Sequence, residues 1–342
     1  MKKILSVLAF QLAAVSFTFA QQPMIYLTGY TYSDKQASIG HVMTADGKPL
    51  KQFKISGRDA NAVETNKSGE ITVKSAVLKK NPKNLEISIT AGNGSQQYTE
   101  NYTLLADEFN RNKVIAHRGA WKKTATPENS IAALKEAVKL GCYGSEFDVH
   151  LSADGVIFVN HDPEIQGVSM EKSDAAKLNT VRLKDGEPLP QLENFLKAGM
   201  SQQTTKLILE IKPSVVSPER AIQLTHEVLK LVRKLKAEAW VEYISFDYEA
   251  CKEVIKLAPY AKVSYLKGDK SPEELAADHF FGLDYHYSVL QKNPDWVKSA
   301  KANHLAINVW TVNDSAVMDE MLKTGADYIT TNEPELLFEK VK

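Results

Sequence analysis

The stretch VIAHRGAWKKTATPENSIAALKEAVKLGCYGSEFDVHLSADGVIFVNHD, residues 114–162, contains the pattern that decides the fold. A short apolar run at 114–116 precedes a helical segment at 131–140, and a second strand-like run follows at 144–149. A strand, a helix and another strand in this order predict a unit of a parallel sheet.

The helical segment has an apolar face formed by Ile131, Leu134 and Val138, which recur at helical spacing. Asn129 is the expected N-cap of this helix, because its side chain can accept a hydrogen bond from the first turn. Gly141 is the expected stop, because glycine tolerates the left-handed conformation that ends many helices.

The same alternation continues to the end of the chain and predicts an α/β fold, a TIM (β/α)₈ barrel, over residues 114–342. Helices such as 221–235 and 314–324 separate most of the runs. The further expected strands are 156–160, 206–211, 241–246, 261–266, 282–287, 306–311 and 327–331. These make nine candidates for eight places. Only a short turn, 152–155, joins the 144–149 and 156–160 runs, so either the two form a hairpin or one barrel helix is missing.

The segment before the barrel reads as short strands and turns, which predicts a small Ig-like β-sandwich over residues 21–105. Asp46-Gly47 and Gly92-Asn93-Gly94 are expected hairpin turns. No cluster of chemically active residues stands out here, so we interpret the segment as a packing module, with a binding module as the alternative. A polar linker is expected at 106–113.

Residues 1–20 have the features of a secretory signal peptide. Lys2 and Lys3 precede an apolar run, and cleavage is expected after Ala20. No later segment is long and apolar enough to cross a membrane. We therefore expect an exported protein, periplasmic or extracellular.

Charge and cysteine content say little about the function of the chain. The 42 basic residues equal the 42 acidic residues, so bulk charge gives no reason to expect a nucleic-acid partner. Cys142 and Cys251 are the two cysteines, and the sequence leaves open whether they form a disulfide or remain buried thiols. The oligomeric state is also open.

Strongly polar residues follow four of the expected strands, at the end where barrel enzymes place their active sites. These residues are His117 and Arg118, then Glu146 and Asp148, then His161, and finally Glu210 and Lys212. Glu146 and Asp148 lie two apart on one strand and therefore project from the same face. Three carboxylates that converge on one mouth repel each other unless a cation lies between them. Oxygen ligands favour a hard divalent metal, calcium or magnesium, bound by Glu146, Asp148 and Glu210.

The two histidines indicate acid–base catalysis, because imidazole titrates near neutral pH. His117 and His161 are therefore the candidate catalytic residues. Arg118 is a candidate phosphate clamp and Lys212 adds a second positive charge, so the site favours an anionic substrate and phosphoryl chemistry.

The order and spacing of these motifs resemble the glycerophosphodiester phosphodiesterase family over roughly residues 113–340. The matching motifs are Ile115-Ala116-His117-Arg118-Gly119, Pro127-Glu128-Asn129-Ser130, Glu146-Phe147-Asp148-Val149, Asp154-Gly155, His161-Asp162, Leu209-Glu210-Ile211-Lys212, Ser245-Phe246-Asp247 and Val309-Trp310-Thr311-Val312-Asn313. The resemblance implies a TIM barrel and metal-dependent hydrolysis of a small glycerophosphodiester to glycerol phosphate and an alcohol. It also implies that Trp310 lines the substrate pocket, and it leaves Glu128 a secondary role, near the metal or orienting His117 or Arg118.

The chain departs from the family after His161-Asp162, where Pro163-Glu164-Ile165-Gln166-Gly167 replaces a stretch rich in threonine and glycine. We also expect the chain to lack the small inserted domain that some members carry near this point, which predicts a more open pocket and leaves the alcohol headgroup undecided. The alternative function is a related phospholipase C- or D-type enzyme that acts on intact phospholipid. Such an enzyme needs exposed apolar loops, for which Phe280-Phe281 and Trp296 are candidates. A non-catalytic barrel and a sugar hydrolase with paired carboxylates explain fewer of the polar residues.

Overall fold

In the computed structural model of the chain, residues 25–44, 47–94 and 96–341 are described. The expected signal peptide, residues 1–20, lies outside this range. Among the described residues, no helix has both the length and the apolar character that a membrane crossing requires.

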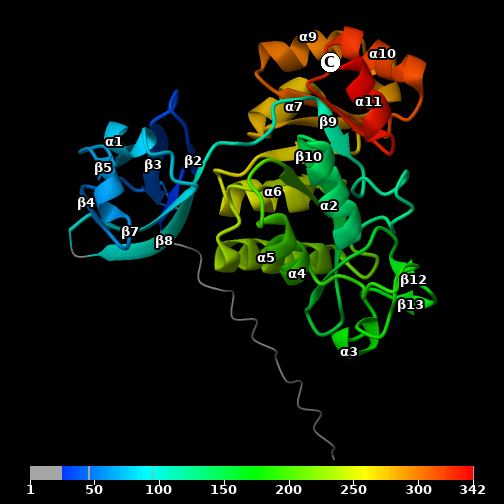
Figure 1. Cartoon of the computed structure of the whole chain (residues 1–342), viewed down its shortest axis with the longest axis horizontal. Coiled ribbons are helices and arrows are strands. Elements are labelled where there is room, and N and C mark those ends of the chain that lie inside the picture. Colours follow the sequence, from blue (N-terminus) through cyan, green and yellow to red (C-terminus); the bar gives the residue numbers. More distant parts are fainter. Residues whose placement is uncertain (1–24, 45–46, 95, 342) are drawn as a thin grey trace, which may run out of the picture.

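Eight parallel strands close into a barrel, because β9 pairs with both β10 and β19 at the two ends of the strand order. The predicted TIM barrel is therefore confirmed (Figure 1). The barrel strands are β9 (Val114–Ala116), β10 (Gly144–Leu151), β14 (Lys206–Ile211), β15 (Val241–Ser245), β16 (Val263–Tyr265), β17 (Gly282–His286), β18 (Ala306–Trp310) and β19 (Tyr328–Thr331).

Helices follow the barrel strands and cover the outside of the ring (Figure 1). They are α2 (Ile131–Leu140), α4 (Leu192–Gly199), α5 (Pro218–Leu235), α6 (Tyr248–Leu257), α7 (Pro272–Ala277), α8 (Tyr287–Lys292), α9 (Asp295–Ala302), α10 (Ser315–Thr324) and α11 (Pro334–Lys340). The α5 helix shows why the boundaries form where they do. Ser217 caps its first turn, Pro218 occupies the first helical position, and six buried residues recur along one face.

The ninth candidate strand lies outside the ring. This strand, β11 (Ile157–Val159), pairs antiparallel with β10, so the two form the hairpin that the short turn allowed. The chain then makes β12 (Glu164–Ile165), β13 (Val168–Ser169) and α3 (Ala175–Leu178) before α4 begins. These segments form an insert with its own small core, so the expectation that the chain lacks an inserted unit here is wrong. The core residues are Phe158, Met170, Ala175, Leu178, Val181 and Leu189.

Residues 25–106 are rich in strands and form two four-stranded sheets. One sheet has the order β1-β3-β6-β5, with β1 (Ile25–Leu27), β3 (Ser38–Thr44), β5 (Val63–Thr65) and β6 (Glu70–Val73). The other has the order β2-β8-β7-β4, with β2 (Thr31–Tyr32), β4 (Gln52–Ser56), β7 (Asn84–Gly92) and β8 (Gln97–Ala106). Two short helical segments, Ala60–Ala62 and α1 (Ser75–Leu78), lie between strands.

The two expected hairpins of this region have different outcomes. Strands β7 and β8 pair antiparallel on either side of Gly92-Asn93-Gly94, which confirms that turn. The Asp46 residue of the other turn lies outside the described residues. Its flanking strands, β3 and β4, belong to different sheets, so the expected pairing between them is wrong.

The N-terminal sheets lie beside the barrel (Figure 1, at the left), and they contact residues that precede the strands β15 and β16. Tyr26 and Tyr30 pack against Tyr260, with ring centroids 5.9 and 5.0 Å away. Glu86 forms an ion pair with Lys236, which precedes β15. Because barrel active sites lie at the carboxyl ends of the strands, this contact leaves the opposite mouth uncovered.

Candidate active site

Glu146, Asp148 and Glu210 meet at the carboxyl end of two neighbouring strands, β10 and β14. One ligand oxygen from each lies within 4.8 Å of the others, and all three residues are buried. The parallel pairing of Asp148 with Glu210 places these two side chains side by side. The predicted convergence of the three carboxylates is therefore present in the structure.

These carboxylates have the properties expected of a cation site. In the described part of the chain, Glu146 Oε1 is buried and accepts no hydrogen bond, while the buried Asp148 Oδ1 and Glu210 Oε1 lie beside the Lys212 ammonium. Burial and the charge of Asp148 raise the pKa of Glu210 to about 8, and the same two causes raise that of Glu146 well above its usual value. Three buried carboxylates that repel each other and have one lysine among them fit a hard divalent cation.

Lys212 lies between two of the carboxylates. Its Nζ atom is 2.9 Å from Glu210 Oε1 and 3.3 Å from Asp148 Oδ1. Burial alone would raise the pKa of Asp148, but the positive charges of Lys212 and His161 hold it below its usual value. Lys212 therefore balances part of the negative charge and keeps one of the carboxylates ionised.

The loop after β9 is shaped to bring a backbone donor to this cluster. Arg118 adopts a left-handed backbone conformation with φ of 57°, and its N–H donates to Glu146 Oε2 at 2.8 Å. Gly119 also has a positive φ, and a Cβ atom there would lie 2.7 Å from Ala133 of α2. Only glycine fits this position, because any side chain would strain the turn or push the loop away from the helix.

The Arg118 side chain is held by Glu128. Its Nη1 atom donates to Glu128 Oε1 at 2.9 Å, while its Nε atom lies 3.8 Å from Asp148 Oδ2. Of the roles open to Glu128, the contact with Arg118 is the one that the structure contains. Its carboxylate orients the guanidinium at the edge of the cluster.

His117 faces the cluster from the end of β9. Its Nδ1 atom lies 2.8 Å from Asn332 Oδ1, and its Nε2 atom lies 3.9 Å from Glu146 Oε2. Because Asn332 Oδ1 can only accept, the proton of a neutral His117 is on Nδ1 and the lone pair is on Nε2. Burial and the nearby Arg118 charge lower the pKa of His117 to about 4.

His161 has a different partner. It lies just beyond β11, and its Nδ1 atom is 2.7 Å from the carboxylate oxygen Asp162 Oδ1. A carboxylate can only accept here, so Nδ1 carries a proton. Nε2 is therefore the nitrogen that can give a proton to a substrate or take one from it. His161 is more exposed than His117, with 35% of its side chain accessible against 19%.

Asn129 is the main correction to the predicted site. It does not cap α2, because Ser130 does so by accepting from the Ala133 N–H at 2.9 Å. Asn129 is buried and makes two bonds with Asp148, from its Nδ2 to Oδ2 and from the Asp148 N–H to its Oδ1. Its left-handed backbone, with φ of 57°, turns it from the helix toward the cluster.

Sequence reasoning missed Asn332, and it gave no role to Asn313, the last residue of a matching motif. Asn332 follows β19 directly, so the rule that found the other site residues at strand ends applies to it as well. Asn313 accepts from the Asn332 N–H at 2.8 Å and fixes the loop that carries the partner of His117.

The opposite wall of the mouth is aromatic. Trp310 ends β18, and its ring meets those of Phe246 and His286 edge to face, with centroids 5.4 Å away in each case. The indole N–H donates to the backbone carbonyl of Asp284 at 2.8 Å, which fixes the ring. Phe246 directly follows β15, His286 ends β17 and Trp310 ends β18, so Trp310 lies across the barrel end from the charged residues of β9, β10 and β14.

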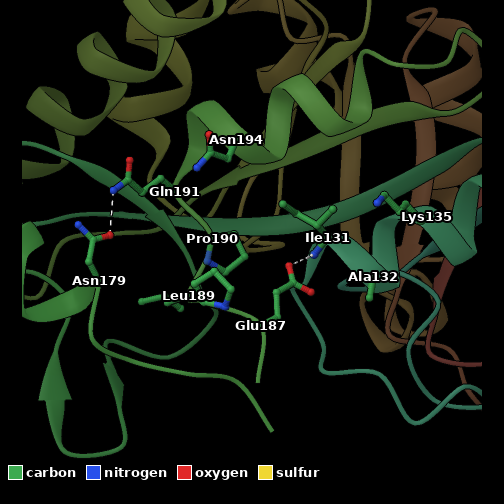
Figure 2. Close-up of a pocket in the computed structure, with 10 residues that line it drawn as sticks. Ile131, Ala132, Lys135, Asn179, Glu187, Leu189, Pro190, Gln191 and Asn194 are labelled. Atoms are coloured by element: carbon green, nitrogen blue, oxygen red, sulfur yellow. Dashed lines mark hydrogen bonds between the residues drawn. The ribbon is translucent and has the colours of Figure 1, made fainter. Parts of the chain in front are cut away.

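A separate cavity of about 520 Å³ lies on the outside of the barrel, between α2, the end of the insert and α4 (Figure 2). Its lining is Ile131, Ala132, Lys135, Asn179, Glu187, Pro188, Leu189, Pro190, Gln191 and Asn194, which includes none of the predicted site residues. Glu187 accepts from the Ile131 N–H at 2.9 Å, so it satisfies the first turn of α2 and ties the insert to that helix.

The two cysteines are buried, free thiols, so the alternative of a disulfide between Cys142 and Cys251 is wrong. Burial raises the pKa of Cys142 to about 12, which keeps this thiol protonated.

Comparison with known proteins gives one consistent result. Residues 117–336 match the model of the glycerophosphoryl diester phosphodiesterase family. A glycerophosphodiester phosphodiesterase of Caldanaerobacter subterraneus is 28% identical over 245 residues, which cover 67% of this chain and 97% of that protein.

Solved structures agree with this match. A glycerophosphodiester phosphodiesterase from Parabacteroides distasonis is 45% identical, with a TM-score of 0.66 over 68% of this chain and 98% of its own. One from Agrobacterium tumefaciens is 25% identical, with a TM-score of 0.55 over 66% of this chain and 98% of its own.

Proposed function

The chain belongs to the glycerophosphoryl diester phosphodiesterase family, and on that premise we propose that it hydrolyses small glycerophosphodiesters to glycerol phosphate and an alcohol. One observation carries this proposal. Glu146, Asp148 and Glu210 converge in a buried cluster between two histidines, with Arg118 and Lys212 beside it. Such a site has the means to bind a phosphate and to move two protons.

Glu146, Asp148 and Glu210 are the proposed metal ligands, and calcium or magnesium is the proposed ion. The support is the oxygen-only donor set, the burial of the three carboxylates and the absence of a hydrogen-bond donor to Glu146 Oε1 in the described part of the chain. A bound divalent cation would neutralise negative charge on the phosphate and acidify the attacking hydroxyl.

The two histidines have complementary partners, which supports different roles for them. His117 is neutral at neutral pH because its pKa lies near 4, and its Nε2 lone pair faces the cluster, so we assign it as the base for the attacking hydroxyl. His161 has a carboxylate partner that can balance an imidazolium charge, so we assign it as the acid for the departing alkoxide.

The remaining proposed roles concern substrate binding. Arg118 and Lys212 are the proposed phosphate contacts, because they bring positive charge to the edge of the carboxylate cluster. Trp310 is the proposed contact for the glycerol or alcohol portion, since it lies on the aromatic wall across the mouth.

Activity on intact phospholipid is the second candidate, and the structure gives it little support. Phe280 is buried and Trp296 packs against Tyr285, so neither forms an exposed apolar loop. The exposed large hydrophobic residues near the mouth are Val215 and Val216, after Lys212, within the described part of the chain. Two adjacent valines are a small surface for docking on a membrane.

The deciding experiment incubates the purified protein with glycerophosphocholine, glycerophosphoethanolamine and glycerophosphoglycerol, and measures glycerol phosphate release. Phosphatidylcholine vesicles and a glycoside form two further arms. We expect release from the deacylated diesters, loss of it with a chelator and recovery with calcium or magnesium. Activity that survives complete metal removal would contradict the metal site, and turnover of vesicles alone would favour the second candidate.

Two further proposals concern the parts outside the barrel. We propose that residues 21–105 form an Ig-like sandwich joined by the 106–113 linker, which the two sheets and their shared apolar core support. We also propose that residues 1–20 are removed on export to the periplasm or the medium. Mass measurement of the mature protein from an exporting host tests the cleavage after Ala20.

A further inference from the structure

His150 extends the row of site residues on β10 but has no part in the reaction described above. Glu146, Asp148 and His150 alternate along the strand and therefore project from the same face. His150 is 2% exposed, so substrate cannot reach it. Its Nε2 atom lies 3.1 Å from the backbone carbonyl oxygen of His161. A carbonyl oxygen only accepts, so the Nε2–H of His150 donates to the backbone of His161, the proposed general acid.

The other side of the His150 ring faces Glu171. The Nδ1 atom of His150 lies 3.9 Å from Glu171 Oε1, which is close but beyond hydrogen-bond distance, and Glu171 is also buried. Glu171 belongs to the insert, in the region where the sequence departs from the family pattern. It accepts from the Val215 N–H at 3.0 Å and from the Ser214 hydroxyl at 2.5 Å. Both donors lie in the loop that follows Lys212.

The packing of His150 against Glu171 and the hydrogen bonds on either side of this pair bring two parts of the candidate site together. One end of the connection is the loop after Lys212, and the other is the peptide of His161. Asn160 anchors the same turn, because its N–H donates to the Asp148 carbonyl at 3.0 Å and its side chain donates to the Asp162 carbonyl at 2.7 Å. The turn therefore remains attached to β10 without His150, and what His150 adds is the orientation of the His161 peptide itself.

We propose that His150 and Glu171 are positioning residues that fix the backbone of His161 relative to Lys212, so that the His161 imidazole reaches the leaving group. This inference rests on the proposed phosphodiesterase function. It assigns a task to the insert, which holds the carboxylate that joins the two loops. A shift of about 1 Å in a catalytic group can cost about 10²-fold in rate. A buried hydrogen bond to the His161 peptide can therefore affect the rate by fixing where the His161 side chain lies.

The test compares His150→Phe, which removes the donor and keeps a ring, with His150→Gln, whose amide can replace the Nε2 donor. With glycerophosphocholine we expect His150→Phe to lose about 10- to 100-fold in kcat with little change in KM. His150→Gln is expected to stay within a few-fold of the wild type. Glu171→Gln keeps one acceptor and is expected to fall between the two.

A second substrate separates positioning from general damage. A p-nitrophenyl phosphodiester releases a phenolate that needs no protonation, so a defect that acts through the acid shrinks with it. We expect the loss in His150→Phe to shrink in the same way as the loss in His161→Ala. The matched control is His226→Phe, which alters a His–Glu pair on the outer helices, 2.9 Å from Glu253, and is expected to keep wild-type kinetics.

Hydrogen exchange of the peptide that covers residues 157–165 gives a readout that does not require turnover. We expect faster exchange in His150→Phe than in His150→Gln. A folded His150→Phe with wild-type kcat, an equal loss on both substrates, or unchanged exchange would overturn the positioning role. If His150→Phe does not fold, the leaving-group test on Glu171→Gln decides. Wild-type protein that cleaves no glycerophosphodiester contradicts the proposed function instead, and the exchange data then decide the positioning of His161 alone.

Discussion

The Nδ1 atom of His117, at the end of the first barrel strand, lies 2.8 Å from Oδ1 of Asn332, just after the last. The two residues are 215 positions apart in the chain and meet only because the barrel closes between β9 and β19. An amide partner orients the imidazole without adding negative charge. It therefore fixes which nitrogen faces the carboxylates while leaving the ring neutral.

Asn332→Asp changes the charge of this partner and keeps its shape. A carboxylate beside His117 favours the imidazolium, so we expect its pKa to rise from about 4. The acidic limb of the kcat/KM profile moves to higher pH by about one unit or more. Asn332→Ala removes the orientation instead and lowers kcat without moving that limb. Identical profiles for the wild type and Asn332→Asp would contradict the assignment of His117 as base.

Removal of each histidine separates the proposed base from the proposed acid. His117→Ala and His161→Ala are each expected to lose about 10²- to 10⁴-fold in kcat on glycerophosphocholine while the fold remains intact. With a p-nitrophenyl phosphodiester, His161→Ala recovers most of its activity and His117→Ala does not, since only the leaving group has changed. Recovery in the opposite variant would reverse the two roles. Circular dichroism spectra check the fold of both proteins.

The carboxylate cluster predicts a stability that depends on both pH and metal. The folded pKa of Glu210, about 8, lies above its usual 4.5, so the metal-free folded state binds more protons than the unfolded state between these values. Stability of the metal-free protein is therefore lost as the pH rises through this window, and Glu146 adds to the effect. A bound cation removes this loss, because it favours the ionised carboxylates.

Thermal midpoints at pH 5, 6.5 and 8, measured with a chelator and with excess calcium or magnesium, test this expectation. Asp284 and Glu238 have pKa values raised to about 7 by burial, so they contribute a background slope in both conditions. The metal-dependent difference between the slopes is therefore the quantity to compare. It is expected to shrink in Glu210→Gln. Equal slopes with and without metal in the wild type would argue against a cation at the cluster.

Trp310→Ala tests the aromatic wall. Loss of the ring is expected to raise KM for a glycerophosphodiester by about 3- to 10-fold, since an aromatic contact contributes about 0.5–1.5 kcal/mol beyond its area. Trp310→Phe keeps a ring and is expected to lie nearer the wild type. Trp296→Ala is the matched control, because that indole packs against Tyr285 on the outside of the barrel. An unchanged KM in folded Trp310→Ala would remove Trp310 from the substrate pocket.

The barrel and the charged cluster were predictable because both follow from local patterns. Apolar runs that alternate with helices predict the strands, and polar residues at strand ends predict the convergence of Glu146, Asp148 and Glu210. The nine candidate strands were resolved only by pairing, since periodicity cannot distinguish the β10–β11 hairpin from a barrel crossover. The failed pairing of β3 with β4 has the same cause, because a turn signal does not determine which sheet each strand joins.

The partners of the site residues were not predictable in this way. Asn129 precedes a helix and has the residue type of a cap, but Ser130 takes that position and frees Asn129 to bind Asp148. Asn332 meets His117 across 215 positions and Glu171 lies beside His150 across the insert, through contacts that exist only after the barrel and the insert have folded. The helix and strand propensities of neighbouring residues do not predict such tertiary contacts.

The N-terminal sheets attach to the barrel through Tyr26, Tyr30 and Glu86, on the side opposite the candidate active site. A solid support or another macromolecule that binds those sheets attaches to the molecule on the side of the amino-terminal ends of the barrel strands. The catalytic opening then points away from the point of attachment, and diffusing diesters approach it without passing the tether. Immobilisation through the sheets should therefore preserve the rate of substrate capture, whereas a linkage through the insert beside His161 should obstruct it.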